Sequence, residues 1–259
     1  MKCVVIGLGW LGLPLAKQLV AAGFSVTGTT RQRTILADEI NLLSYAPESG
    51  IPSDLAHKLS TADCVVLAFP PNRSSFEQYA SDCVQIAGEC SKTARILLIS
   101  STGVYPEKNG FVVETDTDLL PDTTNSLLFA ERSLTALLGN RLTIIRMAGL
   151  IGGNRYPVRA MAASGKSYAA SELVNVVHQN DAVACCLHVI TQQHWGITVN
   201  CCTSEHPTKK AFYSWMASQL ESALPEFVES AATGKIVRND KSLAIGFMYH
   251  YHSPFDFPI

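Results

Sequence analysis

Short apolar runs alternate with longer amphipathic stretches through the first 150 residues of the chain. The apolar runs are rich in valine, isoleucine and leucine, which is typical of parallel strands covered on both faces, and they span residues 2–6, 25–29, 64–69, 95–100 and 142–147. The stretches between them have helical spacing and span residues 11–22, 33–41, 74–91 and 126–138. Because strands that alternate with helices form right-handed crossovers, the pattern predicts an α/β fold built on a doubly wound parallel sheet.

The pattern becomes less regular beyond the last of these strands, where glycines and prolines interrupt it. We expect one helix over 181–191, a strand over 198–202 and another helix over 212–221. The simplest organisation is an α/β domain over residues 1–150 followed by a C-terminal segment over 151–259. That segment is expected to add the last elements of the sheet and a small lobe of its own.

The composition is that of a folded protein without a strong charge. Of the 259 residues, 47% are hydrophobic and 16% are charged, and 20 basic against 22 acidic side chains give a net charge of −2. This balance excludes a disordered chain, and it lacks the basic excess of a nucleic-acid-binding protein. No run approaches the roughly 18 apolar residues of a membrane span, and the N-terminus does not have the pattern of a signal peptide. We therefore predict a cytoplasmic protein with no nucleic-acid or membrane partner.

Eight cysteines are present, and none is in a C-x-x-C motif or at zinc-ligand spacing from histidine. Neighbouring side chains point in different directions, so the adjacent pairs at 185–186 and 201–202 are poor disulfide partners. We expect mostly buried, reduced thiols and no metal site, with a redox role as the alternative.

The first strand runs directly into a G-x-G-x-x-G turn that opens an amphipathic helix, which is the context that a dinucleotide-binding motif requires. In such a motif Gly7 permits the tight turn, Gly9 lets the backbone approach a pyrophosphate, and Gly12 lets the helix pack closely on the strand. The N-terminus of the helix adds N–H groups and a positive dipole end. The alternative is a glycine turn without a ligand. The predicted cofactor-binding residues here are Gly7, Leu8, Gly9, Trp10, Leu11 and Gly12.

The end of the second strand bears on the choice of cofactor. An NAD site usually has an acidic residue there, about 20 residues beyond the glycine motif, but this chain has Thr29, Thr30 and Arg31. Hydroxyls and a guanidinium suit a 2′-phosphate, so the sequence favours NADP, with NAD as the second choice. The missing acid also disfavours S-adenosylmethionine. The alternative is that Arg31 and Arg33 are ordinary surface charges.

Four segments together resemble a known family. They are the glycine motif, SSTGVY at 100–105, RMAGLIG at 146–152 and VNVVHQND at 174–181. In this order they resemble the extended short-chain dehydrogenase/reductase superfamily, also called the NAD-dependent epimerase/dehydratase family, and most closely its small, atypical YeeZ-like branch. The resemblance covers nearly the whole chain. It implies a Rossmann-type NAD(P)-binding domain and a small C-terminal substrate lobe, with the substrate between them.

The resemblance also implies roles for individual residues. Ser101 corresponds to the serine or threonine that hydrogen-bonds the reacting carbonyl or hydroxyl, with Thr102 as its neighbour. Tyr105 ends the same segment and is a candidate phenol for the site, although a packing role is the alternative. Further cofactor contacts are expected at the ends of three strands, from Ala68, Phe69, Pro70, Ser100 and Leu150.

One departure from the family concerns its acid/base pair, Tyr-x-x-x-Lys. If Glu131 matches the family's helix glutamate, Thr123 and Leu127 occupy the positions of the tyrosine and the lysine. None of the eight tyrosines has a lysine four residues later. Ordinary hydride transfer between alcohol and ketone by the family mechanism is therefore in question.

Arg155 and His178 are the candidate substrate-binding residues. Arg155 lies in a glycine-rich loop where a guanidinium can bind a phosphate or carboxylate, although solvent exposure explains it equally well. His178 precedes Asn180 and Asp181, so a structural role beside a helix cap is the alternative.

Two functions follow from these patterns. The first is an NADP-dependent oxidoreductase or epimerase that acts on a small polar or sugar-like molecule, as a monomer or homodimer. The second is a non-catalytic NADP(H)-binding sensor or regulatory protein, which the missing Tyr/Lys pair motivates.

Overall fold

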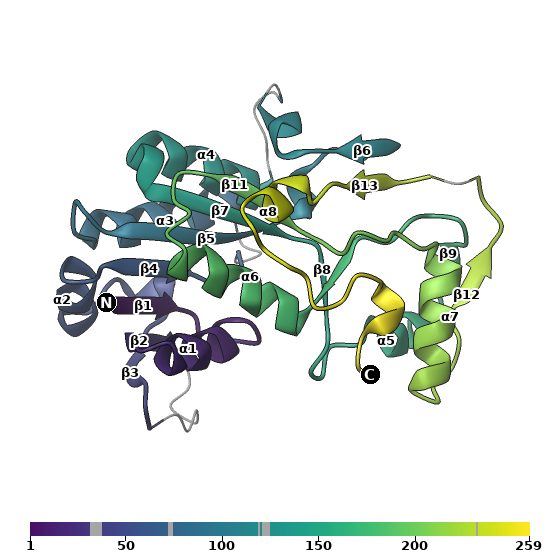
Figure 1. Ribbon diagram of the computed structural model, residues 1–259, viewed down its shortest axis with the longest axis horizontal. Helices are drawn as coiled ribbons and strands as arrows, with labels where there is room; N and C mark the ends of the chain where they lie inside the picture. Colours follow the sequence, from purple (N-terminus) through teal and green to yellow (C-terminus); the bar gives the residue numbers. More distant parts are fainter. Residues whose placement is uncertain (32–37, 72–74, 119, 121–124, 232) are drawn as a thin grey trace. The chain divides into compact units, whose positions relative to one another are not determined.

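The computed structural model describes residues 1–31, 38–71, 75–118, 120, 125–231 and 233–259 (Figure 1). Its largest element is a seven-stranded sheet with the order β11-β7-β5-β4-β1-β2-β3. The strands are β1 (Lys2–Ile6), β2 (Ser25–Thr30), β3 (Asn41–Ser44), β4 (Cys64–Leu67), β5 (Arg95–Ser101), β7 (Leu142–Met147) and β11 (Thr198–Cys201). This is the strand order of a Rossmann fold, in which the order of successive strands across the sheet reverses between β1 and β4. The predicted fold class is therefore confirmed.

Helices cover both faces of this sheet (Figure 1). They are α1 (Gly12–Ala21), α2 (Ser53–Ser60), α3 (Phe76–Glu89), α4 (Ser126–Leu138) and α6 (Gln179–Thr191). The apolar sides of α2, α3 and α4 pack on one face, where Leu55, Ile86 and Leu134 join strand residues such as Val65 and Ile96 in a buried core. That core holds the carboxyl ends of the strands in fixed positions, which is where ligands bind in this fold.

Three parallel two-stranded ribbons and three short helices form most of the remaining structure. The ribbons pair β6 (Gly110–Val112) with β13 (Lys235–Val237), β8 (Gly149–Ile151) with β10 (Val176–His178), and β9 (Ser167–Ala169) with β12 (Glu226–Val228). The helices are α5 (Pro157–Ala163), α7 (Lys209–Gln219) and α8 (Asp240–Ala244). Single 3-10 turns are η1 (Pro47–Ser49), η2 (Thr102–Val104), η3 (Glu114–Thr117), η4 (Gly139–Arg141) and η5 (Pro254–Asp256).

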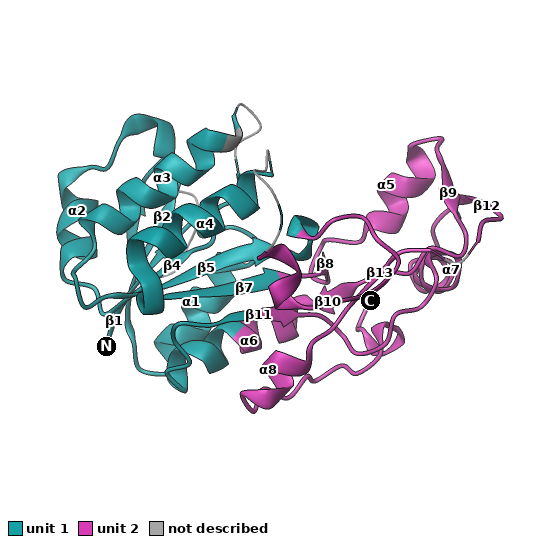
Figure 2. Cartoon of the chain, turned by 90° about the horizontal axis from the view of Figure 1, so that it is seen from above, with its two compact units in different colours: residues 1–104, 120–146, 186–198 teal, residues 105–119, 147–185, 199–259 magenta. Residues whose placement is uncertain are grey.

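The chain forms two compact units, coloured separately in Figure 2. Unit 1 comprises residues 1–104, 120–146 and 186–198, and unit 2 comprises 105–119, 147–185 and 199–259. The units are interleaved along the sequence, so no single cut near residue 150 separates them. Residues 186–198 of the C-terminal part of the chain belong to unit 1.

The element boundaries agree with the expected ones except in one region. The helix expected over 33–41 is wrong at its described end, because residues 38–40 form a turn and β3 begins at Asn41; residues 32–37 lie outside the described part. The helix α2 was not expected from the sequence, because it is only eight residues long and buries only Leu55 and Leu59.

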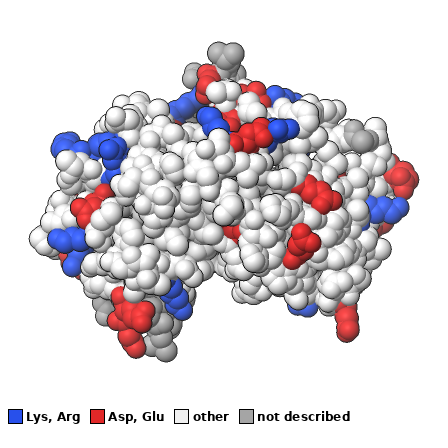
Figure 3. Space-filling model, viewed as in Figure 1, with Lys and Arg blue, Asp and Glu red and all other residues white. Residues whose placement is uncertain are grey.

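The distribution of surface charge and the length of the helices are the features relevant to partners. In Figure 3, basic and acidic side chains are intermixed over the face that is shown. Among the helices of the described residues, none is long and apolar enough to cross a membrane. All eight cysteines are buried and carry free thiols. The sequence predicted mostly buried, reduced thiols.

Candidate functional site

The glycine motif forms a turn that only glycine permits at two of its positions. Gly7 has a φ of +98°, in the left-handed region that favours glycine. A Cβ on Gly12 would overlap with the carbonyl oxygen of Gly7, so the start of α1 lies directly against the end of β1. This close packing puts the N-terminal N–H groups of α1 beside the turn.

The middle glycine of the motif faces open space. No described atom lies within 4 Å of the position that a Cβ on Gly9 would occupy. Gly9 is therefore the one glycine of the motif where an added methyl group would meet no protein and would enter the space that a ligand needs. This is the geometry of a backbone cradle for a pyrophosphate, so the residues present fit a dinucleotide.

The turn is fastened to β2 through Thr29. The Thr29 hydroxyl accepts a hydrogen bond from the Gly7 N–H (3.0 Å), and its carbonyl accepts one from the Leu8 N–H (2.8 Å). Thr29 is almost fully buried. Its hydroxyl thus supports the turn, and the expected contact of Thr29 with the cofactor stays a prediction.

Arg31 follows the last residue of β2 and is exposed, with its guanidinium 3.4 Å from the carboxylate of Glu48. Glu48 lies in η1, just beyond β3, and the pairing of β3 with β2 brings it back to this strand end. Glu48 was not expected at this site. Its approach to Arg31 depends on the pairing of the short edge strand β3 with β2, which has no clear pattern in the sequence. An acidic residue does stand near the end of β2, but it comes from another element and is paired with Arg31. Arg33 lies outside the described residues.

The exit of β5 separates three hydroxyls that are adjacent in the sequence. Ser100 is buried and donates to Glu131 Oε1 at 2.5 Å. Thr102 is buried as well. Ser101 is half-buried, and its oxygen accepts a hydrogen bond from the Gly103 N–H at 3.0 Å. Since this bond uses a lone pair and not the hydroxyl proton, Ser101 can still donate to a ligand, whereas Ser100 has a structural role.

A buried ion pair supports this strand end from behind. Arg146 on β7 donates from Nη2 to Glu131 Oε2 at 2.7 Å, and from Nε to both carboxylate oxygens at 3.1 and 3.2 Å. The two side chains are 4% and 3% exposed. Together with Ser100, the pair ties β5, α4 and β7 to one another within unit 1.

The start of α4 is where the family's acid/base pair is expected. Thr123 lies outside the described residues, and Leu127 is half-buried in the first turn of the helix. Asn125 caps α4 by accepting from the Leu127 and Leu128 N–H groups at 3.1 Å. It also donates to the Gly103 carbonyl at 3.0 Å, so the helix start is tied to the Ser101 segment.

The exit of β4 provides the next wall of the cofactor region. The Ala68 N–H donates to the Ile6 carbonyl at 2.9 Å, and the Phe69 carbonyl accepts from the Tyr79 hydroxyl at 3.3 Å. Because a Cβ on Gly7 would lie 3.1 Å from the Cβ and the backbone nitrogen of Phe69, this strand end packs tightly against the glycine turn. Ala68 and Phe69 thus lie beside the glycine turn, and the contact of Ala68, Phe69 and Pro70 with a cofactor stays a prediction.

Tyr105 and His178 belong to unit 2 and both have structural roles there. The buried Tyr105 hydroxyl donates to Asn200 Oδ1 at 2.6 Å. His178 is also buried; its Nδ1 accepts from the Asn180 N–H at 3.2 Å, and its ring packs edge-on against Tyr251. Burial, and to a lesser degree the charge of His250, holds the pKa of His178 below its ordinary value of 6.5. The imidazole is therefore neutral at pH 7, with its proton on Nε2.

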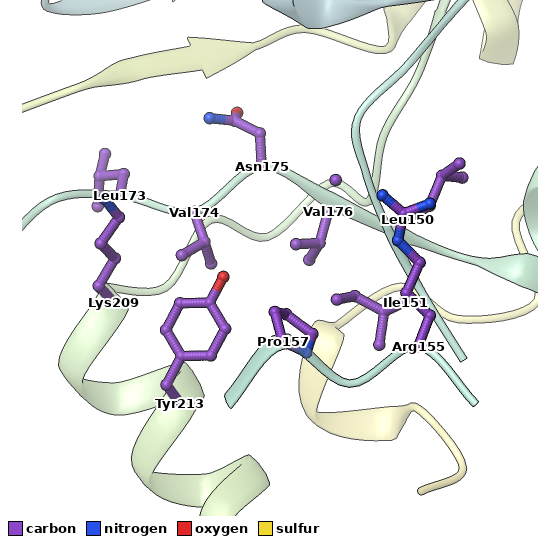
Figure 4. Close-up of a pocket in the computed structure, with 11 residues that line it drawn as sticks. Leu150, Ile151, Arg155, Pro157, Leu173, Val174, Asn175, Val176, Lys209 and Tyr213 are labelled. Atoms are coloured by element: carbon purple, nitrogen blue, oxygen red, sulfur yellow. The ribbon is translucent and has the colours of Figure 1, made fainter. Parts of the chain in front are cut away.

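Two expected site residues line a pocket in unit 2 (Figure 4). Leu150 belongs to β8, and Arg155 belongs to the loop that follows it. The two predicted sets of residues thus lie in different units, the cofactor set chiefly in unit 1 and the substrate set in unit 2. Within the described part of the chain, no three His, Cys, Asp or Glu side chains gather as a metal site.

A glycine turn that opens a helix at the switch point of a Rossmann sheet defines a dinucleotide-binding protein. The chain belongs to the NAD(P)H-binding family, whose model matches residues 7–193. It is 34% identical to Protein YeeZ of Escherichia coli (strain K12) over an alignment that covers 100% of this chain and 99% of that protein. The expected family is therefore confirmed.

Solved structures show the same fold at lower identity. A protein from Methylobacillus flagellatus assigned as an NAD-dependent epimerase/dehydratase has a TM-score of 0.76 and 22% identity, with 97% of this chain and 94% of that chain covered. The UDP-glucuronic acid 4-epimerase of Bacillus cereus in complex with NAD has a TM-score of 0.78 and 18% identity, with 99% and 95% covered.

Proposed function

We propose that this protein is an NADP-dependent oxidoreductase or epimerase that acts on a small polar or sugar-like molecule. The observation that carries the proposal is the open glycine turn at the start of α1, with Arg31 at the end of the neighbouring strand. The epimerase/dehydratase fold of the structural neighbours supports the reaction class, and the UDP-sugar named for the Bacillus cereus enzyme supports a sugar-like substrate.

In the proposed enzyme, residues of unit 1 bind the cofactor and contact the reacting oxygen of the substrate. The backbone at Gly9 and the N–H groups of α1 bind the pyrophosphate, and Arg31 exchanges its contact with Glu48 for one with the 2′-phosphate. Ser101 donates a hydrogen bond to the oxygen of the substrate where charge changes during the reaction. The nicotinamide, when bound, supplies or accepts the hydride. The buried pair Glu131–Arg146 keeps the strand that carries Ser101 in place.

The proton of the reaction has to come from another source than the family's tyrosine. Leu127 has no proton to give, and the hydroxyl of Tyr105 is committed to Asn200. The ring of His178 is packed in the core of unit 2. This leaves water as the proton donor in the enzyme that we propose.

The presence of Leu127 at the lysine position of the family favours a second candidate function. A chain that keeps the dinucleotide turn and replaces the ionisable lysine position with Leu127 has the parts of an NADP(H) sensor or regulatory protein. Such a protein binds the cofactor as tightly as the enzyme does but does not turn it over.

Cofactor choice is tested by calorimetric titration of NADPH and NADH into the wild-type protein and the Arg31→Ala variant. We expect the variant to lose about 10- to 100-fold in NADPH affinity, since one charged hydrogen bond contributes roughly 1.5–3 kcal/mol, and to keep its NADH affinity. Lys92→Ala is the matched control, because this exposed lysine precedes β5 at the opposite end of the strand from Ser101. An equal loss for both cofactors contradicts the assigned role of Arg31.

Turnover separates the enzyme from the sensor. NADPH oxidation is followed with a panel of aldehydes, ketones and nucleotide-sugars. Where a substrate is found, Ser101→Ala should lower kcat by about 100-fold, the usual effect of removing a donor to a developing oxyanion. Thr102→Val, which changes the neighbouring buried hydroxyl, should have a much smaller effect. Tight NADPH binding without turnover on any member of the panel favours the sensor.

A further inference from the structure

The pocket of unit 2 has a volume of about 340 Å³ and an apolar floor. The floor comprises the apolar lining residues, which are Leu150, Ile151, Pro157, Leu173, Val174 and Val176. Ile151, Val174 and Val176 also belong to the buried core of unit 2, so this surface is rigid and exists without a ligand. The volume lies near the lower end of the range of roughly 300–1,000 Å³ for small-molecule sites.

The polar groups of the pocket are chiefly two cations and a phenol. Figure 4 shows Lys209 and Arg155 at opposite sides of the pocket, with the ring of Tyr213 between them. Lys209 pairs with Glu172 at 2.6 Å, so its charge is already partly balanced. Burial raises the pKa of Tyr213 to about 12, so its hydroxyl remains a donor.

Arg155 is held by a turn that depends on glycine. The Arg155 N–H donates to the Gly152 carbonyl at 3.0 Å, and the Gly152 N–H donates to the Arg155 carbonyl at 3.3 Å. Gly152 has a φ of +112°, and a Cβ there would overlap with the imidazole of His178. The buried ring of His178 therefore supports the turn that presents Arg155, which makes His178 a positioning residue for the pocket.

Lys209 is held at the first position of α7. Thr208 caps this helix by accepting from the Ala211 N–H at 3.2 Å. The N–H groups of Lys209 and Lys210 donate to the carbonyls of Glu172 and Ala170 at 2.7 and 3.1 Å. Because the first N–H groups of the helix have protein partners, a ligand in the pocket meets the Lys209 side chain and not the helix N-terminus.

We propose that the pocket of unit 2 binds a small organic anion, whose carboxylate or phosphate group contacts Arg155 and whose uncharged body lies on the apolar floor and extends toward Lys209 and Tyr213. The size favours one small molecule over a complete nucleotide-sugar. This names the class of substrate or effector of the protein and in that respect rests on the proposed function. The pocket itself is formed by unit 2 alone, so its binding is measurable without a cofactor.

Ligand chemistry is tested by titrating named probes into the full-length protein in the absence of NADPH. Phenylacetate and phenyl phosphate carry the two anionic groups on one apolar body, and 2-phenylethanol is the neutral match. Glucose 6-phosphate against glucose repeats the comparison on a sugar. We expect at least one anion to bind at least tenfold more tightly than its neutral match, and the preferred anion tells carboxylate from phosphate. Equal affinity for charged and neutral probes, or no binding by any anion, overturns the proposal.

Variants locate the binding. Arg155→Gln should weaken the binding of the preferred anion about tenfold, and Lys209→Gln should weaken it less, because Glu172 already balances that charge. Lys210→Gln is the matched control: this neighbouring lysine does not line the pocket and pairs with Glu229 at 3.2 Å. Affinity that is unchanged in Arg155→Gln, or reduced as much in Lys210→Gln as in Lys209→Gln, contradicts the assignment. NADPH titrations of the same proteins report separately on the proposed function.

Discussion

The glycine turn of unit 1 is made from six consecutive residues, whereas the pocket of unit 2 takes its walls from four separate segments of the chain. The turn works through its backbone, so its chemistry depends on the absence of side chains at Gly9 and Gly12. The pocket works through charged side chains on an apolar floor, so its chemistry depends on which side chains are present. The first kind of site is visible in a sequence motif, and the second only after the chain has folded.

The largest effect on stability is expected from the buried side-chain network that supports β5 in unit 1. Glu131→Gln removes the charge that balances the buried guanidinium of Arg146 and should lower the free energy of unfolding by about 3–5 kcal/mol. Denaturant unfolding measures this loss. The double variant Glu131→Leu/Arg146→Met should recover much of it, because no buried charge is then left unpaired.

Lys210→Gln is the control for that experiment. It breaks an exposed ion pair, with side chains 57% and 85% exposed, and should change the free energy of unfolding by less than about 1 kcal/mol. A loss in Glu131→Gln as small as the loss in Lys210→Gln shows that the buried pair does not hold unit 1 together.

Gly12→Ala tests how the turn of unit 1 depends on close backbone packing. The added methyl group overlaps with the Gly7 carbonyl, so we expect a loss of about 1–3 kcal/mol in the free energy of unfolding. The control is Gly88→Ala in α3, where no described atom lies within 4 Å of the new methyl group. That substitution should stabilise the protein by up to about 1 kcal/mol. If Gly12→Ala is as stable as the wild-type protein, the packing of α1 on β1 is looser than described.

The fold was predictable where one element carries its own signal. The boundaries of β1 and β7 follow from continuous apolar runs that are buried on both faces, and the glycine motif marks the start of α1. The region after β2 was not predictable, because β3 is a short edge strand with only half-buried leucines at Leu42 and Leu43. The sequence predicts no strand at 41–44, and the helix that it predicts over 33–41 overlaps β3 only at Asn41.

The site residues were likewise predictable only where a local motif marks them. The role of Gly9 follows from local spacing, but the contact of Arg31 with Glu48 depends on the pairing of β3 with β2. Likewise, Lys209 lines the pocket only because α7 folds back beside Leu173 and Val174. Contacts of this kind join residues far apart in the sequence, and one sequence does not contain a local signal for them.

The pH dependence of stability reports on buried side chains of unit 2. Burial lowers the pKa of His178 and of His206 below 6.5, so the unfolded chain binds protons that the folded chain does not. Stability is therefore fully present above pH 6.5 and is lost as the pH falls through that value. Each unit of pKa shift corresponds to about 1.4 kcal/mol. Asp181, whose pKa burial raises above 3.8, has the opposite effect nearer that pH.

Thermal unfolding between about pH 7.5 and about pH 5.5 measures this dependence, within the range where histidine titrates. We expect the melting temperature to fall on acidification and the slope to be shallower in His178→Gln. The same slope in both proteins contradicts the buried, neutral state of His178.

The smallest effect concerns the exposed pair beside the turn. Glu48→Gln frees Arg31 from its partner, and since such pairs contribute roughly 0.2–1 kcal/mol, NADPH affinity should rise only a fewfold. NADH affinity should not rise. Parallel calorimetric titrations measure both, and a drop in NADPH affinity shows that Glu48 helps to bind the cofactor.

The most direct test of the central claim is calorimetric titration of NADPH into the wild-type protein and Gly9→Ala. A methyl group on Gly9 meets no described atom, so the variant should unfold at the wild-type temperature and yet bind NADPH at least tenfold more weakly, because the methyl group occupies the space of the pyrophosphate. Wild-type affinity in this variant, or no NADPH binding by the wild-type protein at millimolar concentration, would contradict the assignment of the turn as a dinucleotide site.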